Sequence, residues 1–340
     1  MKLKPINRFI IPIFIFYIFI FAGCKDNSNS VVVYTTVDQV FSEPVLKKFE
    51  SQTGIKIKAV YDTEETKSTG ILNRLIAEKG NPQCDMFWSG DPMRTVVLEN
   101  KGMLYPYISK SAEGIDEEFK DKDHLWTGFS ARARVLIYNK DLLKKEDVPQ
   151  SIFDLTSEKY KGKVAIANPL FGTTTFYLAA LFSIIGDEKA KAYLQDLKNN
   201  NVVIATSNGD VKKRVVKGEV FCGLTDTDDA FEAIKDGDNI GMVFLDQQGI
   251  GNLIMPNTVS LIKKEKISDN AKKLIDYLLS PETESALSYS CAQMPLHKGV
   301  KTAKNIPSPD KIKPMKIDYI ETAKKLKEIQ NYLKKWVEKQ

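Results

Sequence analysis

The chain has 340 residues, of which 43% are hydrophobic and 27% charged, and its 49 Lys and Arg against 44 Asp and Glu give a formal net charge of +5. This length suggests two domains, and the nearly balanced charge, without a stretch that interleaves Arg with aromatic residues, argues against nucleic-acid binding. Cys84, Cys222 and Cys291 stand apart among apolar or small neighbours, without a C-x-x-C spacing. We therefore expect isolated, buried thiols and neither a disulfide framework nor a cysteine metal site.

Residues 1–23 have the pattern of a secretion signal. A basic start leads into the apolar run 9–21, and small residues then precede Cys24. The run is shorter than the about 20 residues that a membrane span needs. A cysteine at this position resembles a bacterial lipoprotein signal, which implies cleavage before Cys24, lipid on its sulfur and periplasmic or extracytoplasmic attachment to a membrane. An ordinary signal peptide with an incidental cysteine is the alternative. Residues 24–30 are predicted to be a polar lipid tether.

Strands and helices alternate along the rest of the chain. In the first half we predict strands at 31–34, 55–61 and 84–88, with helices after each. In the second half we predict strands at 163–167, 202–205 and 220–224, followed by helices that end at Gly186, Gly218 and Gly237. Continuous apolar runs such as 31–34 are typical of strands buried on both faces. The alternation predicts an α/β protein with mostly parallel sheets.

Two strand-like segments, 131–138 and 251–262, connect these halves. The chain is therefore expected to leave a first lobe, build a second one and return. We predict that residues 31–133 plus 252–340 form lobe 1 with the C-terminal helices, and that 134–251 form lobe 2. Apolar residues at three- and four-residue steps over 317–337 predict an amphipathic helix with a solvated, Lys-rich outer face.

Polar clusters follow six of the predicted strands. In open α/β sheets, ligands bind beyond the carboxyl ends of the strands, near helix N-termini. We therefore expect these clusters to face one another across a cleft, although ordinary helix capping is the alternative for each. The candidate ligand-binding residues are Thr35, Thr36, Asp38, Glu64, Ser89, Gly90, Arg132, Asn168, Gly172, Thr173, Thr174, Asn208, Thr225, Asp226, Asp228 and Asp229.

The acidic cluster at 225–229 contains more carboxylates than a helix cap uses. One oxygen satisfies the cap, each further acid gains only about 0.3–1 kcal/mol from the helix dipole, and the acids repel one another. A positive or donor-rich group opposite Asp228 and Asp229 would offset that repulsion. By contrast, the Gly-Thr-Thr start of the helix at 172 offers free N–H groups and hydroxyls, which favour a phosphate or a carboxylate. Arg132 and Arg134 lie on the crossing segment, where a guanidinium can reach the cleft or pair with an acid.

Several segments together resemble the extracellular solute-binding proteins of ABC importers. They are "VVVYTTVDQ", "FESQTGIKIK", "CDMFWSGDP", "RARVLIYN", "KYKGKVAIANP", "NLIMPNTVSLIKK" and "LIDYLLSPETESAL". The resemblance covers nearly all of residues 31–300. More narrowly, the chain resembles the branch of these proteins that includes periplasmic ferric-iron-binding proteins. It implies a two-lobed periplasmic-binding-protein fold (type II), each lobe a mostly parallel sheet flanked by helices, joined by a two-strand hinge. It also implies a monomer that delivers its ligand to an ABC permease and its ATPase subunit.

The same resemblance bears on the cargo, with ferric iron as the first candidate. The family's iron binders use a His after the first strand, a Glu after the third, and two adjacent Tyr. Here these positions hold Asp38, Gly90 and the pair Asp228–Asp229. Carboxylates are hard oxygen donors, so the three Asp residues are candidate ligands of Fe(III), with a small synergistic anion at the Thr-rich helix start. The alternative is a phosphorylated sugar or a phosphonate, whose anion would bind at that helix start and whose hydroxyls or amine would meet the acids.

An enzyme is the second class of function considered. Ser260-x-x-Lys263 and the Ser-Asp-Asn at 268–270 superficially resemble serine acyl-transfer motifs, but they are too close together and no Lys-Thr-Gly follows. His124 and His297 lie far apart in unlike settings and are expected to be structural or exposed. We therefore expect neither catalytic residues nor a catalytic cofactor. A surface adhesin would need repeats or a large exposed apolar patch, and the sequence indicates neither.

Overall fold

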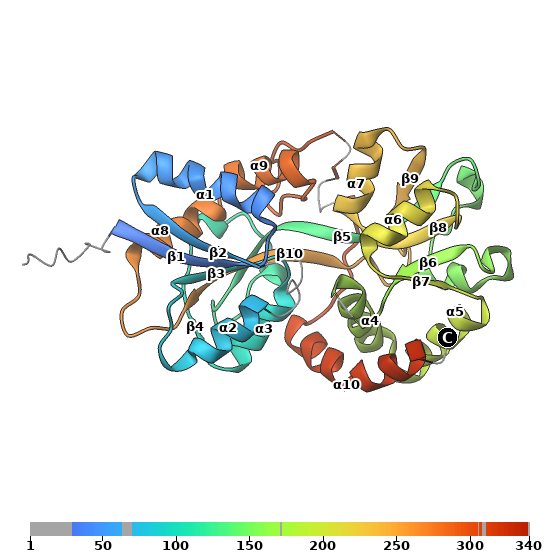
Figure 1. Ribbon diagram of the computed structural model, residues 1–340, viewed down its shortest axis with the longest axis horizontal. Coiled ribbons are helices and arrows are strands. Elements are labelled where there is room, and N and C mark those ends of the chain that lie inside the picture. Colours follow the sequence, from blue (N-terminus) through green and yellow to red (C-terminus); the bar gives the residue numbers. More distant parts are fainter. Residues whose placement is uncertain (1–28, 63–69, 171, 305, 308–310, 339–340) are drawn as a thin grey trace, which may run out of the picture.

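The computed structural model describes residues 29–62, 70–170, 172–304, 306–307 and 311–338, which form two α/β lobes side by side (Figure 1). The predicted signal, most of the tether, Cys24 and Glu64 lie outside these residues. Within the described ranges, no helix is both long and apolar enough to cross a membrane.

The first lobe is built from both ends of the chain. Its elements are β1 (Ser30–Thr35), α1 (Gln39–Thr53), β2 (Lys56–Tyr61), α2 (Gly70–Ala77), β3 (Met86–Ser89), α3 (Pro92–Asn100), β4 (Leu104–Tyr105), α8 (Asp269–Leu278) and α9 (Pro281–Cys291). β1 pairs in parallel with β2 and β3, and β3 pairs antiparallel with β10 (Ile254–Ile262). The central strand β1 is mostly buried, as its apolar run predicts.

The second lobe is built from the middle of the chain. Its elements are β6 (Val164–Ala167), α4 (Gly172–Ile185), α5 (Asp187–Asn199), β7 (Val203–Ala205), α6 (Asn208–Val216), β8 (Cys222–Asp226), α7 (Thr227–Asp236) and β9 (Ile240–Val243). β6 lies between β7 and β8 and is parallel to both.

Short 3-10 helices occupy Glu78–Gly80, Lys110–Ala112, Glu117–Phe119, Lys145–Asp147, Ile152–Thr156 and Glu158–Tyr160.

The long strand β5 (Thr127–Asn139) belongs to both lobes. Its first part, Thr127 to Ala133, pairs with β10 of the first lobe. Its second part, from Arg134 onward, pairs with β8 and β9 of the second lobe. The hinge is therefore a strand that changes partners between residues 133 and 134. The predicted two-lobed α/β architecture with two crossing strands is confirmed.

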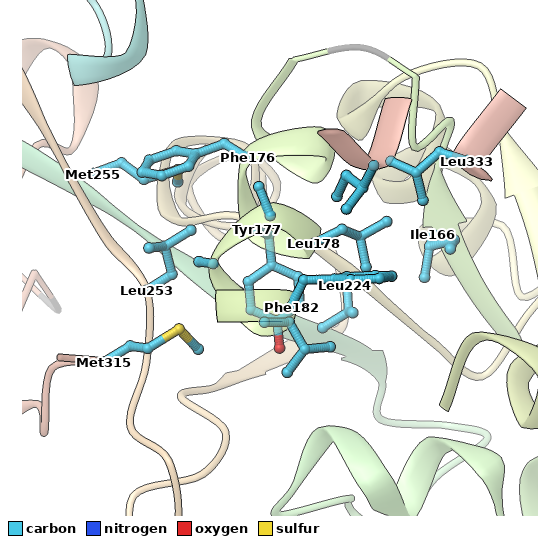
Figure 2. Packing of buried hydrophobic residues seen from close by; sticks show 14 of the residues in the cluster. Ile166, Phe176, Tyr177, Leu178, Phe182, Leu224, Leu253, Met255, Met315 and Leu333 are labelled. Atoms are coloured by element: carbon cyan, nitrogen blue, oxygen red, sulfur yellow. The ribbon is translucent and has the colours of Figure 1, made fainter. Parts of the chain in front are cut away.

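The core of the second lobe forms around α4, which is apolar on nearly every side and buried from Thr174 to Phe182. Such a helix is stable only when other elements cover it all round. Figure 2 shows how sheet, helix and hinge residues converge on it. The labelled side chains are Ile166, Phe176, Tyr177, Leu178, Phe182, Leu224, Leu253, Met255, Met315 and Leu333.

The C-terminal helix α10 (Tyr319–Glu338) covers α4 from the outside (Figure 1). The indole N–H of Trp336 donates to the Leu194 carbonyl at 3.0 Å. At the start of the helix, the Tyr319 ring contacts Trp126 at 5.8 Å and Phe176 at 6.2 Å, joining elements on both sides of the hinge. The predicted division of the chain into lobes by residue number stays a prediction. It assigned this helix to lobe 1, whereas the helix lies mainly against second-lobe elements.

Cys84, Cys222 and Cys291 are buried and free, as expected from their spacing. Burial raises the pKa of the Cys222 and Cys291 thiols to about 12, so both remain protonated at neutral pH. They contribute packing and carry no negative charge.

Candidate functional site

A cleft of about 520 Å³ opens between the lobes and is lined by residues of both. Eleven of the sixteen predicted ligand-binding residues line it. These are Thr36, Asp38, Gly90, Arg132, Gly172, Thr173, Thr174, Asn208, Asp226, Asp228 and Asp229. A polar hollow between lobes, built from separate strand ends, is the arrangement that the sequence pattern predicts.

Five helices, α1, α3, α4, α6 and α7, begin at this cleft. Each brings the positive end of its dipole, which favours a negatively charged group. Asp91 caps α3 by accepting from the Met93 N–H at 2.9 Å, and Ser207 caps α6. In contrast, neither Asp38 nor Asp226 makes a side-chain capping bond, although each is the residue before its helix.

The carboxylates of the acidic cluster have partners other than the helix. Asp226 accepts from Arg134 at 2.7 Å, and Asp228 accepts from Arg132 at 3.3 Å. Asp229 accepts from the Thr225 hydroxyl at 2.8 Å. Because Asp226, the residue before α7, makes no side-chain capping bond, helix capping does not account for its carboxylate. The two arginines supply the positive charge that offsets the repulsion.

Arg134 is buried behind the second-lobe residues that line the cleft and hydrogen-bonds to several of them. Its side chain is only 1% exposed, and one guanidinium nitrogen donates to Asp226, to the Asn208 amide oxygen at 3.0 Å and to the Thr173 hydroxyl at 3.2 Å. The other terminal nitrogen donates to the Thr174 hydroxyl at 2.9 Å. A single buried cation therefore fixes residues from α4, α6 and β8.

Arg132 points into the cleft and contacts both lobes. One nitrogen donates to the Gly90 carbonyl at 3.0 Å in the first lobe, and the other donates to Asp228 in the second. Arg132 and Arg134 share a face of β5 because alternate residues of a strand point the same way. The partner change of the strand falls between them, so the first guanidinium spans the hinge and the second belongs to one lobe.

The negative charge of the cluster remains high despite these pairs. Burial, and then the charges of Asp228 and Asp226, raise the pKa of Asp229 to about 7, well above the ordinary value of 3.8. Asp229 therefore titrates near neutral pH. A cationic group in the cleft would favour its ionised form.

Sequence reasoning missed the floor of the cleft, where Asn257, Gln293 and Cys291 lie beside the hinge. The Asn257 amide donates to the Ser130 carbonyl and, at 2.7 Å, to the Gln293 side-chain oxygen. Asn257 lies within an apolar strand, and Gln293 follows a helix end, so neither stands in a polar cluster. Arg94, in the first turn of α3, also lines the cleft, and the Asp91-Pro92 helix start could have drawn attention to it.

Four predicted residues serve the local backbone and do not line the cleft. The Thr35 and Asn168 side chains accept from the N–H groups of Val37 and Leu170. Ser89 is fully buried, and Thr225 donates to Asp229 from a buried position. For these, the structure favours the local roles of caps and turns. Glu64 stays a prediction, because it lies outside the described residues.

Within the described ranges, no group of three His, Cys, Asp or Glu side chains is close enough to hold a metal ion. No tyrosine from the described residues lines the cleft. The assignment of Asp38, Asp228 and Asp229 as metal ligands stays a prediction. The geometry itself offers two guanidinium groups, hydroxyls and five helix N-termini beside a cluster of carboxylates, which can bind a solute bearing both acceptors and donors.

Comparison with known proteins gives a consistent result. Residues 45–314 match the family model described as bacterial extracellular solute-binding protein. The chain is 27% identical over 287 residues to Iron uptake protein A1 of Synechocystis sp., covering 81% of this chain and 76% of that protein. It is also 27% identical over 293 residues to a putative 2-aminoethylphosphonate-binding periplasmic protein of Salmonella typhi, covering 83% and 84%.

Among solved structures, iron-bound HitA from Pseudomonas aeruginosa superposes with a TM-score of 0.78 at 21% identity, covering 89% of this chain and 99% of that one. This likeness shows the fold. It confirms the predicted type II periplasmic-binding-protein architecture.

Proposed function

The chain belongs to the bacterial extracellular solute-binding proteins, and on that premise we propose that it captures a solute in its interlobe cleft and delivers it to an ABC permease with its ATPase subunit. This family consists of transport proteins that bind solutes and is not a family of enzymes. The observation that carries the proposal is the polar cleft of about 520 Å³, lined from both lobes beside a strand that pairs with each of them. Closure of two lobes around one ligand is a known hinge motion of binding proteins.

We further propose that the mature protein is a monomer anchored outside the cytoplasm through lipid on Cys24. The basic start, the apolar run 9–21 and the small residues before Cys24 support this. Replacing Cys24 with Ala is expected to abolish the incorporation of labelled fatty acid into the protein. Equal labelling of the variant and the wild type would contradict lipid anchoring at Cys24.

Ferric iron is the first candidate cargo. The name of the Synechocystis relative supports it, and the carboxylates of Asp38, Asp228 and Asp229 are hard donors suited to Fe(III). A small anion would bind where Thr173 and the start of α4 line the cleft. Because no described tyrosine lines the cleft, a ferric complex here is expected to lack the strong visible band of tyrosinate bound to iron.

A phosphorylated sugar or a phosphonate is the second candidate. Arg94, Arg132 and the five helix N-termini favour it, because guanidinium groups and free backbone N–H groups are the usual partners of phosphoryl oxygens. The name of the Salmonella relative adds support. In this case the carboxylates of the acidic cluster would accept hydrogen bonds from donor groups on the part of the solute away from its phosphoryl group.

The two candidates are separated by binding measurements on the purified, metal-free protein. Titration calorimetry and thermal melting are carried out with Fe(III)-citrate, citrate alone, fructose 6-phosphate and 2-aminoethylphosphonate. A ligand that binds the native cleft raises the melting temperature as its concentration exceeds Kd. Replacing Asp228 and Asp229 together with Asn should abolish that shift for iron, and abolish or weaken it for an organic solute. If the variant binds its ligand as the wild type does, the cleft assignment is wrong.

A further inference from the structure

Two side-chain oxygens of residues that line the cleft have no hydrogen-bond partner. The Oδ1 atoms of Asn257 and Asp228 are both buried and unpaired, and both residues line the same cleft. Asn257 as a whole is only 2% exposed. A buried polar atom without a hydrogen bond costs about 1–3 kcal/mol, so such atoms in a binding cleft point to a missing donor.

The orientation of the Asn257 amide is fixed by its surroundings. Its nitrogen faces the Ser130 carbonyl, which can only accept, and the oxygen of Gln293. Ser130 lies at the β-bulge where the pairing of β5 with β10 shifts, and its φ is +42°. Both hydrogens of the amide are used at this bulge, so the remaining oxygen is available only as an acceptor.

Asp228 is held in a similar way. Arg132 binds its Oδ2 atom at 3.3 Å and anchors itself on the Gly90 carbonyl, while Oδ1 is left unpaired. The two acceptors come from different elements, Asn257 from β10 and Asp228 from the first turn of α7, and both residues line the same cleft.

This side of the cleft holds more carboxyl groups than guanidinium groups. Asp226, Asp228 and Asp229 lie beside Arg132 and Arg134. A positive charge placed here would favour the ionised form of Asp229. A primary ammonium supplies that charge with three donors and no acceptor, whereas a hydroxyl brings no charge and an oxygen that would itself need a donor.

We infer that the cleft contains a subsite for a primary ammonium group of the solute, with Asn257 Oδ1 and Asp228 Oδ1 as its acceptors. The inference rests on the second proposed cargo class, in which the anionic end of the same solute would lie against Arg94 and the helix N-termini. The cargo is therefore an amino-substituted phosphonate or phosphate ester.

Three phosphonates that differ at one position test this subsite. Titration calorimetry compares 2-aminoethylphosphonate, 2-hydroxyethylphosphonate and ethylphosphonate on the wild-type protein. We expect the amine to bind at least tenfold more tightly than the other two, because charge-assisted hydrogen bonds are about twice as strong as neutral ones. Equal binding of the three compounds, or a preference for the hydroxyl, overturns the ammonium subsite and leaves phosphonate capture intact.

Variants then show which residues cause the preference for the amine. Asn257→Leu and Asp228→Asn are each expected to remove most of the advantage of the amine, measured in each variant as the ratio of the Kd of ethylphosphonate to that of 2-aminoethylphosphonate. Asn252→Leu is the matched control, because Asn252 is also buried with an unpaired Oδ1 but is absent from the cleft lining. If Asn257→Leu does not fold, Asp228→Asn keeps nearly the same shape and decides the question alone. An amine preference that survives Asp228→Asn overturns the inference.

The remaining outcomes separate this inference from the proposed function. Binding of Fe(III)-citrate with no binding of any phosphonate overturns the ammonium subsite while the solute-capture role stands. Failure of every solute, including fructose 6-phosphate, to bind or stabilise the wild-type protein counts against both.

Discussion

Replacing Arg134 with Met tests whether this buried cation holds the second-lobe wall together. The guanidinium is 1% exposed and its partner Asp226 is 2% exposed, with 2.7 Å between them. Removing one member of a buried ion pair leaves the other charged and desolvated, which typically costs about 3–5 kcal/mol. We expect Arg134→Met to lose stability in that range. We also expect weakened solute binding, because Thr173 and Asn208 lose their shared donor.

The measurement is urea unfolding followed by tryptophan fluorescence. Arg214→Met is the matched control, since Arg214 is 34% exposed and pairs with Asp210 and Glu219 at the surface. Exposed pairs contribute at most about 1 kcal/mol. Adding Asp226→Asn to Arg134→Met should recover part of the loss by removing the uncompensated charge. Equal losses for the Arg134 and Arg214 variants, or no recovery in the double variant, would refute this account.

Three further predictions concern pH and packing. Because the pKa of Asp229 is raised to about 7 in the folded protein, the native state binds this proton more tightly, so stability falls as pH rises from about 4 to about 7; Asp229→Asn should flatten that decline between melts at pH 5 and pH 8. The hydrogen bond that His297 donates to Glu284 raises the pKa of His297, so its stabilisation is complete below about pH 6.5 and is lost as pH rises through the folded pKa; Glu284→Gln should remove this dependence, and an unchanged pH profile would contradict it. Gly114→Ala should cost about 1–3 kcal/mol in urea unfolding because its Cβ would lie 2.5 Å from the His297 ring, whereas Gly80→Ala, with nothing within 4 Å, should be tolerated; equal stability of the two variants would argue against the clash.

Much of the fold could be predicted because local pattern and tertiary environment agree. The runs at the starts of β1, β6 and β8 are apolar because those strands are buried on both faces. Which strands β5 pairs with on either side of residues 133 and 134 could not be read from its sequence, since a strand can pair with different neighbours and tertiary contacts decide. α5 was missed because it begins directly after Gly186, which marks the end of the preceding helix.

The site was predicted where a polar cluster follows a strand. Prediction failed where side-chain direction decided the outcome. Thr35 and Ser89 precede the cleft by one residue, and the alternation of the strand turns them into the core. Asn257 reaches the cleft floor at a bulge, and a bulge depends on the partner strand as well as on its own residues. Asp226 matched the cleft pattern, but its main partner Arg134 became identifiable only from the fold.

The partner change within β5 has a consequence for how sequences of this kind can vary in length. One residue inserted or deleted between Arg132 and Arg134 would reverse which side of the strand one of them occupies, because strand periodicity is two. The guanidinium groups would then project from opposite sides, and one acid would lose its counter-ion. Surface loops in homologous chains should therefore tolerate gaps freely, while this short stretch should keep a constant number of residues even where its amino acids differ.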